Sequence, residues 1–304
     1  MIKKVLCFSN RAHLSYKQRQ LIIKTTDKAN GEPCEHSRPI EDIGVVVIES
    51  EQVTLSSYLI SALLENKVAL IICDSKHMPS GLMLPLAGNT LQSERFEAQI
   101  SASLPLKKQL WQQTISMKIK NQGAVLKKAT NMEIGNMLAW ASQVKSGDTQ
   151  NLEGRAAAYY WRNLFGENSN FVRRQDGDDP NALLNYGYAI LRAIIARSLV
   201  ASGLIPTLGI HHSNKYNAYC LADDIMEPYR PYVDLMVVDI IQKLHLPPII
   251  TTETKRLLLT LSSLDVKIGA LTRPLMIAAS MTTASLAKCF LGETRKILFP
   301  EIEV

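Results

Sequence analysis

Residues 73–90, CDSKHMPSGLMLPLAGNT, separate two parts of the chain whose sequence patterns differ. Two prolines and two glycines in this stretch interrupt both strand-like and helix-like periodicity. We therefore predict a linker at residues 79–92. It would divide an N-terminal domain over residues 1–78 from a second domain over residues 93–304.

Short apolar runs typical of β-strands fill the first part of the chain. Turn-forming residues at 27–39, DKANGEPCEHSRP, separate the second run from the third. The runs are KVLCFS at 4–9, QLIIKT at 20–25, IGVVVIES at 43–50 and VALIICDS at 68–75. Because these runs are short, rich in branched residues and bounded by turns, they predict a small β-rich domain.

Helical periodicity dominates the second part of the chain. The longest apolar stretch should form a helix that Gly203 and Pro206 bring to an end. The predicted helices lie at 93–122 (one helix or two), 132–147, 152–166, 181–203, 231–244, 252–264 and 273–292. The sequence thus predicts an α+β protein, with a small β-rich N-terminal domain followed by a larger, all-α catalytic domain.

Composition indicates a folded, basic protein. Hydrophobic residues make up 46% and charged residues 20% of the 304 residues, which excludes a disordered chain. With 34 Lys and Arg against 28 Asp and Glu, the net charge is +6, which favours a polyanionic partner such as nucleic acid.

Cysteine usage and hydropathy point to the cytoplasm. The five cysteines are odd in number and never spaced as C-x-x-C, which argues against a disulfide framework and a cysteine zinc site. Residues 189–205, AILRAIIARSLVASGLI, are interrupted by Arg192 and Arg197, so we expect no transmembrane helix and no membrane partner.

Residues 209–228, GIHHSNKYNAYCLADDIMEP, bring two adjacent histidines close in sequence to three carboxylates. If 221–227 is helical, Asp224 and Glu227 project from one face, and Asp223 and Glu227 are also neighbours. Such acids repel each other unless a cation lies between them. A histidine that follows a helix, taken alone, is more often a helix cap, and acids near a helix start are more often ordinary first-turn acids. Together they favour a hard divalent cation, Mg²⁺ or Mn²⁺, with imidazole shifting the preference toward Mn²⁺.

Glu153 is the candidate for a further ligand. Gly154, Ala156 and Ala157 follow it, and such small neighbours would let a ligand helix and a metal-bound backbone approach closely. Glu153 could equally be an ordinary acid in the first turn of a helix. In a basic protein, a divalent ion held this way favours phosphodiester chemistry.

Three separate motifs, in order and spacing, resemble one known family. They are LEGRAAAYYW at 152–161, DPNALLNYGYAILRAIIARSLVASGLIPTLGIHH at 179–212 and LADDIMEPYRPYVD at 221–234. Together they closely resemble the universal integrase of CRISPR adaptation, the first-named CRISPR-associated protein family. Residues 37–50 and 272–297 resemble the versions of this family that accompany type II systems.

This resemblance implies a metal site and assigns its residues. The catalytic, metal-binding residues would be Glu153 in E-G-x-A-A, His212 in G-x-x-H and Glu227 in D-x-x-[DE], holding Mg²⁺ or Mn²⁺. Asp224 would lie beside the site as an assisting acid. Chemistry alone does not choose between the adjacent histidines; the G-x-x-H register selects His212 and leaves His211 as the second choice.

The resemblance also implies an activity and partners. Members insert short duplex DNA, as new spacers, into a CRISPR array by attack of a 3′-hydroxyl on a phosphodiester at the end of a repeat. They act as homodimers, and two dimers are bridged by the small second-named adaptation protein. In type II systems the RNA-guided effector nuclease and a ring-shaped DNA-end-binding protein are further candidate partners.

Basic side chains in or near the predicted catalytic helices are candidates for DNA contacts, although any one of them is more often simply solvated. They are Arg155, Arg162, Arg173, Arg174, Lys127 and Lys128. Tyr159, Tyr160 and Trp161 are candidates for stacking on bases, although core packing is the better expectation for at least two of them.

Two alternative functions use the same residues differently. A structure-selective, metal-dependent endonuclease of DNA repair would cut with water as the nucleophile and would not join strands. A non-catalytic scaffold would bind DNA and partners and would tolerate loss of Glu153 and His212.

Overall fold

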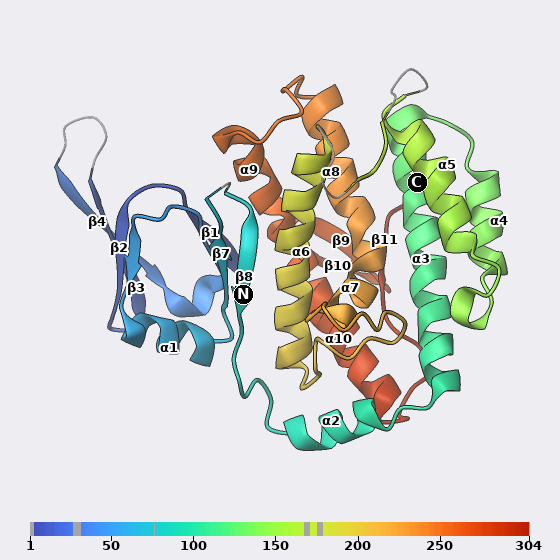
Figure 1. Cartoon of the computed structure of the whole chain (residues 1–304), viewed down its shortest axis with the longest axis horizontal. Helices are drawn as coiled ribbons and strands as arrows, with labels where there is room; N and C mark the ends of the chain where they lie inside the picture. Colours follow the sequence, from blue (N-terminus) through green and yellow to red (C-terminus); the bar gives the residue numbers. More distant parts are fainter. Residues whose placement is uncertain (1–2, 27–31, 76, 167–170, 175–178, 304) are drawn as a thin grey trace. The chain divides into compact units, whose positions relative to one another are not determined.

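The computed structural model describes residues 3–26, 32–75, 77–166, 171–174 and 179–303. The chain divides into two compact units, Met1–Thr90 and Leu91–Val304, which are blue to cyan and cyan-green to red in Figure 1. Together they form a mixed α+β protein with β-sheets in the N-terminal unit and a mainly helical C-terminal unit.

The first sheet of the N-terminal unit has the strand order β1-β5-β7-β8. Its strands are β1 (Lys4–Phe8), β5 (Ile43–Ile48), β7 (Ala69–Cys73) and β8 (Pro79–Met83). β5 pairs in parallel with β1 and β7, and all six of its residues are buried. A continuous apolar sequence is typical of such a central strand, since it is covered on both faces.

The second sheet has the order β4-β3-β2-β6. Its strands are β2 (Ala12–Lys17), β3 (Gln20–Thr26), β4 (Pro33–Pro39) and β6 (Val53–Leu55). Helix α1 (Ser57–Glu65) begins at Ser56, whose side chain accepts a hydrogen bond from the Leu59 N–H. The apolar core of this unit joins residues of both sheets to Leu59 and Leu63 of α1.

Two predictions for this unit are wrong in detail. The predicted turn at 27–39 contains strand β4, although residues 27–31 lie outside the described part. The predicted linker at 79–92 contains strand β8 and the first residue of α2. β8 forms because it pairs with β7, and Pro79 is tolerated because it stands at the first residue of an edge strand.

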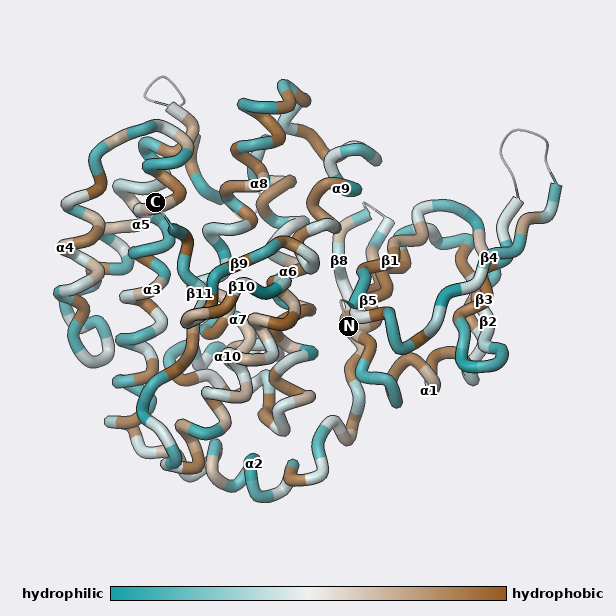
Figure 2. The backbone as a smooth tube through the Cα atoms, turned by 180° about the vertical axis from the view of Figure 1, so that it is seen from behind, coloured by the Kyte–Doolittle hydropathy of each residue, from teal (hydrophilic) through white to brown (hydrophobic). Residues whose placement is uncertain are grey.

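The C-terminal unit is built around helix α6, drawn in yellow in Figure 1. α6 packs against α7, α8, α9 and α10, while α3 packs against α4, α5 and α8. The helices are α2 (Gln92–Ile100), α3 (Leu104–Thr130), α4 (Gly135–Gln143), α5 (Leu152–Leu164), α6 (Asn181–Ala201), α7 (Cys220–Met226), α8 (Arg230–Gln242), α9 (Thr252–Leu259) and α10 (Leu275–Phe290). Hydrophobic and hydrophilic residues alternate along α4 and α5, as expected of helices with one face on a core (Figure 2).

Helix α6 is the core helix of this unit. It is long and apolar enough to cross a membrane by composition, but 78% of its apolar window is buried inside the fold. A Cβ added at Gly187 would lie 2.4 Å from Cγ1 of Val233, so this glycine permits the close approach of α6 and α8. The helix ends at Ala201, two residues before the predicted end, and Gly203 follows its C-cap Ser202 with a φ of 70°, the conformation that makes glycine a helix stop.

The prediction of an all-α second domain is wrong, because this unit also holds a three-stranded antiparallel sheet of order β10-β9-β11. The strands are β9 (Asp265–Ile268), β10 (Leu271–Pro274) and β11 (Pro300–Glu301). These strands are only two to four residues long, so they carry too little alternation to be read from the sequence. The predicted helix at 273–292 accordingly loses its first two residues to β10.

Candidate active site

Glu153 lies in the first turn of α5, where two polar side chains fix its backbone. The carboxylate of Asp148 accepts hydrogen bonds from the N–H groups of Leu152 (2.9 Å) and Glu153 (3.0 Å). Asn151 caps the helix by accepting from the Gly154 N–H, and both Asp148 and Asn151 adopt a positive φ. This constrained turn sets the direction in which Glu153 leaves the helix.

Gly154 has a different role from the predicted one. A Cβ at this position would lie 2.8 Å from the side-chain amide of Asn151. The glycine therefore makes room for the helix cap next to Glu153, rather than for the approach of another backbone.

Glu227 is buried in a single 3₁₀ turn, Glu227–Tyr229, directly after α7. Its Oε1 accepts a hydrogen bond from Nε of Arg230 at 2.8 Å, and its Oε2 lies 2.5 Å from Nζ of Lys118. Burial opposes ionisation of this carboxyl, but Arg230 and Lys118 outweigh burial and lower its pKa to about 2. Glu227 is therefore a carboxylate over the whole physiological pH range.

Lys118 joins the two glutamates. It projects from α3 and is buried, and its Nζ also lies 2.7 Å from Oε1 of Glu153. Burial disfavours the charged form, but Glu227 and Glu153 together outweigh it and raise the pKa of Lys118. Glu153 and Glu227, which are 74 positions apart in the sequence (227 minus 153), therefore share one cation.

His212 is oriented by Asp224. Nδ1 of His212 lies 2.5 Å from Oδ1 of Asp224, and the same carboxylate accepts the backbone N–H groups of Ile210, His211 and His212. Because a carboxylate with these partners is an acceptor, the neutral form of His212 carries its proton on Nδ1 and its lone pair on Nε2. The hydrogen bond with Asp224 raises the pKa of His212, while burial works against it.

The two adjacent histidines have different surroundings. The ring of His211 stacks on the buried ring of Trp111, with centroids 4.1 Å apart, whereas His212 meets that indole edge-on at 5.5 Å. The charges of Glu227 and Glu153 act on His212. His211 therefore has a packing role, and His212 is the histidine whose ring Asp224 orients.

The backbone turn before these histidines depends on Gly209. A Cβ at this position would lie 2.3 Å from the backbone oxygen of His212 and 2.8 Å from Oδ2 of Asp224. Only glycine fits between these two groups without a shift, so the turn and the His212–Asp224 pair form together.

The three acids of 209–228 do not converge, which corrects the prediction that neighbouring acids of this helix share one ion. Asp223 pairs with Nε of Arg192 at 2.6 Å, Asp224 faces His212, and only Glu227 reaches toward Glu153. In the part of the chain that the structure describes, no group of three or more His, Cys, Asp or Glu side chains is close enough to hold a metal ion. The ammonium of Lys118 occupies the position between the two glutamates instead.

A small pocket of about 130 Å³ adjoins the glutamates. Three cationic side chains and two carboxyl groups contribute to its lining, which consists of Lys118, Gln122, Ala157, Trp161, Arg173, Tyr188, Glu227, Arg230 and Asp234. At its base, Asp234 accepts hydrogen bonds from the hydroxyl groups of Tyr160 and Tyr188. Burial raises the pKa of Asp234 to about 6, even though these hydrogen bonds and Arg230 oppose the rise.

Sequence reasoning missed Lys118, Arg230 and Asp148 as parts of this site. A signal for Lys118 was present, since Trp111, Ile115 and Lys118 are spaced four and three residues apart on the buried face of one helix. A charged residue on such a face calls for a buried partner. Arg230 carried no comparable signal, because it follows Pro228 in what reads as a turn.

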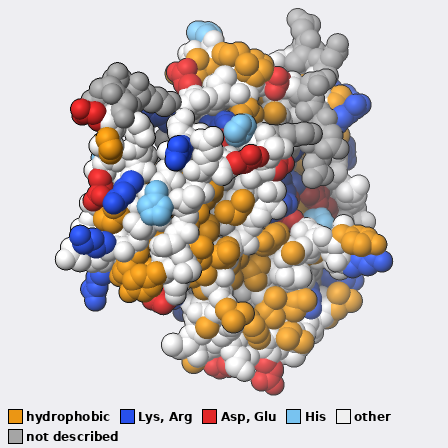
Figure 3. Space-filling model, turned by 60° about the vertical axis from the view of Figure 1, so that its left-hand side comes forward, with side chains coloured by type: hydrophobic (Ala, Val, Ile, Leu, Met, Phe, Trp, Pro, Cys, Tyr) orange, Lys and Arg blue, Asp and Glu red, His pale blue; other side chains and the backbone are white. Residues whose placement is uncertain are grey.

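Some of the side chains predicted to contact DNA are paired with other residues of the protein, and others are exposed. Lys127 lies 3.7 Å from Glu133, and Arg173 donates to Asn181 and Asn185. Exposed side chains remain at Arg155, Arg162, Arg174 and Lys128, although the guanidinium of Arg155 lies over the ring of Trp140, 4.7 Å from its centroid. On the face drawn in Figure 3, basic and acidic side chains are interspersed rather than gathered into one basic stripe.

Of the aromatic candidates for base stacking, Tyr160 is fully buried and hydrogen-bonded to Asp234. Trp161 packs against Tyr160, and Tyr159 against Trp140. The three therefore serve the packing of α5.

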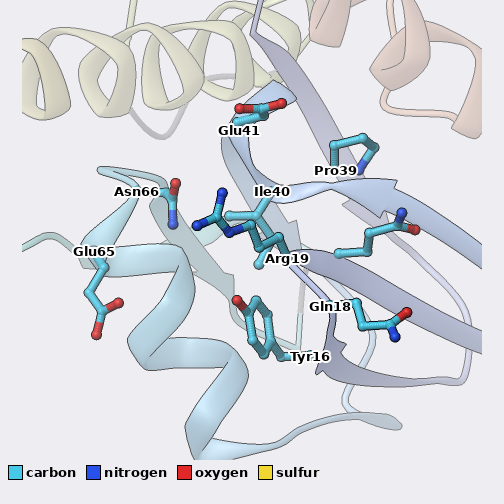
Figure 4. Close-up of a pocket in the computed structure, with 9 residues that line it drawn as sticks. Tyr16, Gln18, Arg19, Pro39, Ile40, Glu41, Glu65 and Asn66 are labelled. Carbon is cyan, nitrogen blue, oxygen red and sulfur yellow. The ribbon is translucent and has the colours of Figure 1, made fainter.

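A pocket of about 580 Å³ in the N-terminal unit is a separate feature. Figure 4 shows Arg19 at its centre, between Glu41 and Tyr16, with Glu65 and Asn66 on the side of α1. Two carboxylates beside one guanidinium make a poor site for a phosphate group. We therefore do not assign this pocket a part in the candidate site.

Comparison with known proteins supports the resemblance. The sequence profile of the family described as CRISPR associated protein Cas1 matches residues 5–266. The CRISPR-associated endonuclease Cas1 of Neisseria meningitidis serogroup C (strain 8013) is 40% identical over 257 residues, which is 84% of this chain and 82% of the relative. A second Cas1 endonuclease, of Pyrobaculum aerophilum, is 27% identical and covers 82% and 88% of the two chains.

Solved structures share the fold. A casposase bound to integration product has a TM-score of 0.79 at 23% identity and covers 97% of this chain and 92% of its own. A Cas1 protein from Thermotoga maritima has a TM-score of 0.72 at 15% identity, with 95% and 97% covered. The profile match over most of the chain and the 40% identical relative show that the chain belongs to the CRISPR associated protein Cas1 family of endonucleases and integrases.

Proposed function

We propose that the protein is a metal-dependent DNA integrase, which inserts short duplex DNA into a CRISPR array. The reaction would join the 3′-hydroxyl of the short duplex to a phosphodiester at the end of a repeat. Beyond family membership, one observation carries the proposal: Glu153 and Glu227, from separate elements, are held around a single positive charge beside an oriented histidine.

The chemistry of the residues present suits Mg²⁺ or Mn²⁺, although in the described part of the chain they do not converge closely enough to hold an ion without a shift of side chains. Two carboxylates and one imidazole are a donor set that suits these ions, with the nitrogen favouring Mn²⁺. Oε2 of Glu227 is buried, and none of the residues that the structure describes donates to it in hydrogen-bond geometry, while the ammonium of Lys118 lies nearby as a stand-in cation. Glu153, His212 and Glu227 would hold the ion, which when bound would stabilise charge on the attacking and leaving oxygens.

The protein's own groups would serve mainly to position the ligands. Asp224 fixes the proton on Nδ1 of His212 and so presents Nε2. Arg230 holds one oxygen of Glu227, and Asp148 anchors the backbone of Glu153. Such preorganisation is the main contribution of a protein to phosphodiester exchange.

The chemical step would be a direct transesterification. The 3′-oxygen forms a bond to phosphorus as the bond from phosphorus to the 3′-oxygen of the target strand breaks, and the leaving oxygen takes up a proton. One phosphodiester replaces another, so the step needs no ATP and no covalent bond to the protein.

Double-stranded DNA and a small second adaptation protein are the proposed partners. The net charge of +6 and the exposed Arg155, Arg162, Arg174 and Lys128 support DNA binding. A solved Cas6-RT-Cas1–Cas2 complex shares the fold, with a TM-score of 0.75. We propose a cytoplasmic homodimer, two copies of which are bridged by Cas2, with a type II effector nuclease and a DNA-end-binding ring protein as further partners.

A strand-joining assay tests this function. Labelled short duplex would be incubated with a supercoiled plasmid that bears a repeat, with Mn²⁺ or Mg²⁺, in the presence and absence of Cas2. We expect joined product with wild type, and none with Glu153→Gln or with a duplex that ends in a 3′-deoxynucleotide. Asp223→Asn, which alters an acid outside the ligand set, is the control.

The two alternatives predict different products. Plasmid cleavage without joining would indicate the repair endonuclease. Joining that survives both Glu153→Gln and His212→Ala would refute the assignment of the site, and DNA binding without either reaction would indicate the scaffold.

A further inference from the structure

We propose that Lys118 is an internal counter-ion of the metal site: it holds Glu153 and Glu227 together before the metal arrives and moves into the adjoining pocket when the metal binds. The inference rests on the proposed metal site. Lys118 would be a positioning residue that sets how tightly the ion is held.

The ammonium of Lys118 lies between the two glutamates. Nζ lies 2.7 Å from Oε1 of Glu153 and 2.5 Å from Oε2 of Glu227, and the Lys118 side chain is only 11% exposed. The three residues come from α3, α5 and the turn after α7, so the lysine is the charge that links these elements.

The metal and the ammonium of Lys118 need the same oxygen, Oε2 of Glu227. Oε1 of Glu227 is already held by Arg230 at 2.8 Å, which leaves Oε2, the atom beside Lys118, as the oxygen available to a ligand. A divalent ion binds carboxylate oxygens at about 2.0–2.2 Å. Two positive charges on one buried oxygen would repel each other strongly, so binding of the ion requires the ammonium to leave.

A hydrogen-bond acceptor for the displaced ammonium of Lys118 lies nearby. Gln122 lies four residues after Lys118 on α3, which places both on one face of the helix. Both line the 130 Å³ pocket, and Oε1 of Gln122 is buried with no hydrogen-bond partner among the described residues. An unpaired buried acceptor is costly, and the ammonium in its displaced position would satisfy it.

Removal of the lysine charge tests the proposal. In Lys118→Met the two carboxylates lose their counter-ion, so the metal-free protein should melt at a lower temperature. Mn²⁺ should then bind about tenfold more tightly or better, since the ion no longer displaces a buried positive charge. Calorimetric titration with Mn²⁺ and thermal melts in EDTA and in Mn²⁺ measure both effects without an activity assay.

A second variant tests the acceptor separately. Gln122→Met removes the buried oxygen, so Mn²⁺ binding should weaken severalfold while the melting temperature in EDTA stays near that of wild type. Lys120→Met is the matched control, since Lys120 is on the same helix, half-exposed and paired with Glu301 at the surface. It should leave Mn²⁺ affinity unchanged.

The outcomes separate this proposal from the proposed function. Unchanged Mn²⁺ affinity in Glu153→Gln would refute the metal site itself. Loss of binding in Glu153→Gln, together with unchanged or weaker binding in Lys118→Met, would refute only the role of Lys118. If Lys118→Met fails to fold, unchanged Mn²⁺ affinity in Gln122→Met overturns the proposal, and weakened affinity supports it.

Discussion

Asp224 holds His212 through both its backbone and its ring, because one carboxylate accepts the N–H of His212 and lies 2.5 Å from its Nδ1. The carboxylate itself is completely buried, while the His212 side chain is 48% exposed. A buried anion thus presents an accessible imidazole, an arrangement that typically fixes the tautomer of a metal-binding histidine. In the proposed metal site, Asp224 would therefore orient a ligand without being a ligand itself.

Asp224→Asn should weaken metal binding and strand joining by about 10- to 100-fold, since the amide no longer stabilises the proton on Nδ1. The Mn²⁺ dissociation constant and the joining rate measure this effect. Asp223→Asn alters the pair with Arg192 and the hydrogen bond from Asn217, both outside the proposed ligand set, and serves as the control. Equal behaviour of the two variants would contradict the proposed role of Asp224.

Gly209→Ala should destabilise the protein by about 1–3 kcal/mol and abolish the His212–Asp224 geometry, because the new methyl group would overlap the backbone oxygen of His212. Urea unfolding measures the loss. Gly135→Ala is the matched control, since a Cβ there meets no atom within 4 Å. A Gly209→Ala variant with wild-type stability would show that the turn is less constrained than described.

Asp234 should make stability depend on pH. Burial raises its pKa from 3.8 to about 6 in the folded protein, so the folded state binds this proton more tightly than the unfolded state does. Its contribution is fully present below pH 4 and is lost as pH rises through about 6. Each pKa unit corresponds to about 1.4 kcal/mol. The free energy of unfolding of wild type, relative to Asp234→Asn, should therefore fall by about 3 kcal/mol as pH rises from 4 to above 6.

Urea unfolding of wild type and Asp234→Asn between pH 3.5 and 7.5 measures this difference. The neutral amide keeps the shape of the side chain and removes its titration, so the two curves should diverge between pH 4 and 6 and run parallel above. Curves that remain parallel throughout would mean that Asp234 titrates normally.

The exposed basic side chains should govern the salt dependence of DNA binding. Arg162→Gln and Arg174→Gln should each lower the slope of log affinity against log salt by about 0.7–0.9, equally for any DNA sequence. Arg173→Gln should act differently and reduce stability, because Arg173 is engaged by Asn181 and Asn185. Fluorescence anisotropy over a range of salt concentrations gives these slopes, and an unchanged slope in Arg162→Gln would remove it from the interface.

Much of the fold followed from the sequence because its signals are local. The all-buried run of β5 and the wide apolar face of α6 are each visible in one segment, and the helix stop at Gly203 is set by backbone conformation. Strand β8 was missed because Pro79 and Gly81 interrupt its strand pattern, and β9 because it is short and pairs with the distant β11. The family resemblance was confirmed by the profile match and the 40% identical relative.

The contacts of the candidate site could not be predicted from the sequence. The family resemblance names Glu153, His212 and Glu227 as ligands, which stays a prediction, and nothing local in the sequence says that Lys118 of another helix lies between the two glutamates. Likewise, three acids close in sequence face three different partners. A short helix sends neighbouring side chains in different directions, so proximity in sequence does not decide what they share.

The most direct test of the central claim is the anomalous diffraction of Mn²⁺ in a crystal of the protein. We predict one strong peak within coordination distance of Glu153, Nε2 of His212 and Oε2 of Glu227, with the ammonium of Lys118 moved toward Gln122. A peak elsewhere, or a saturating soak in which Lys118 still lies between the two glutamates with no metal bound there, would contradict the account.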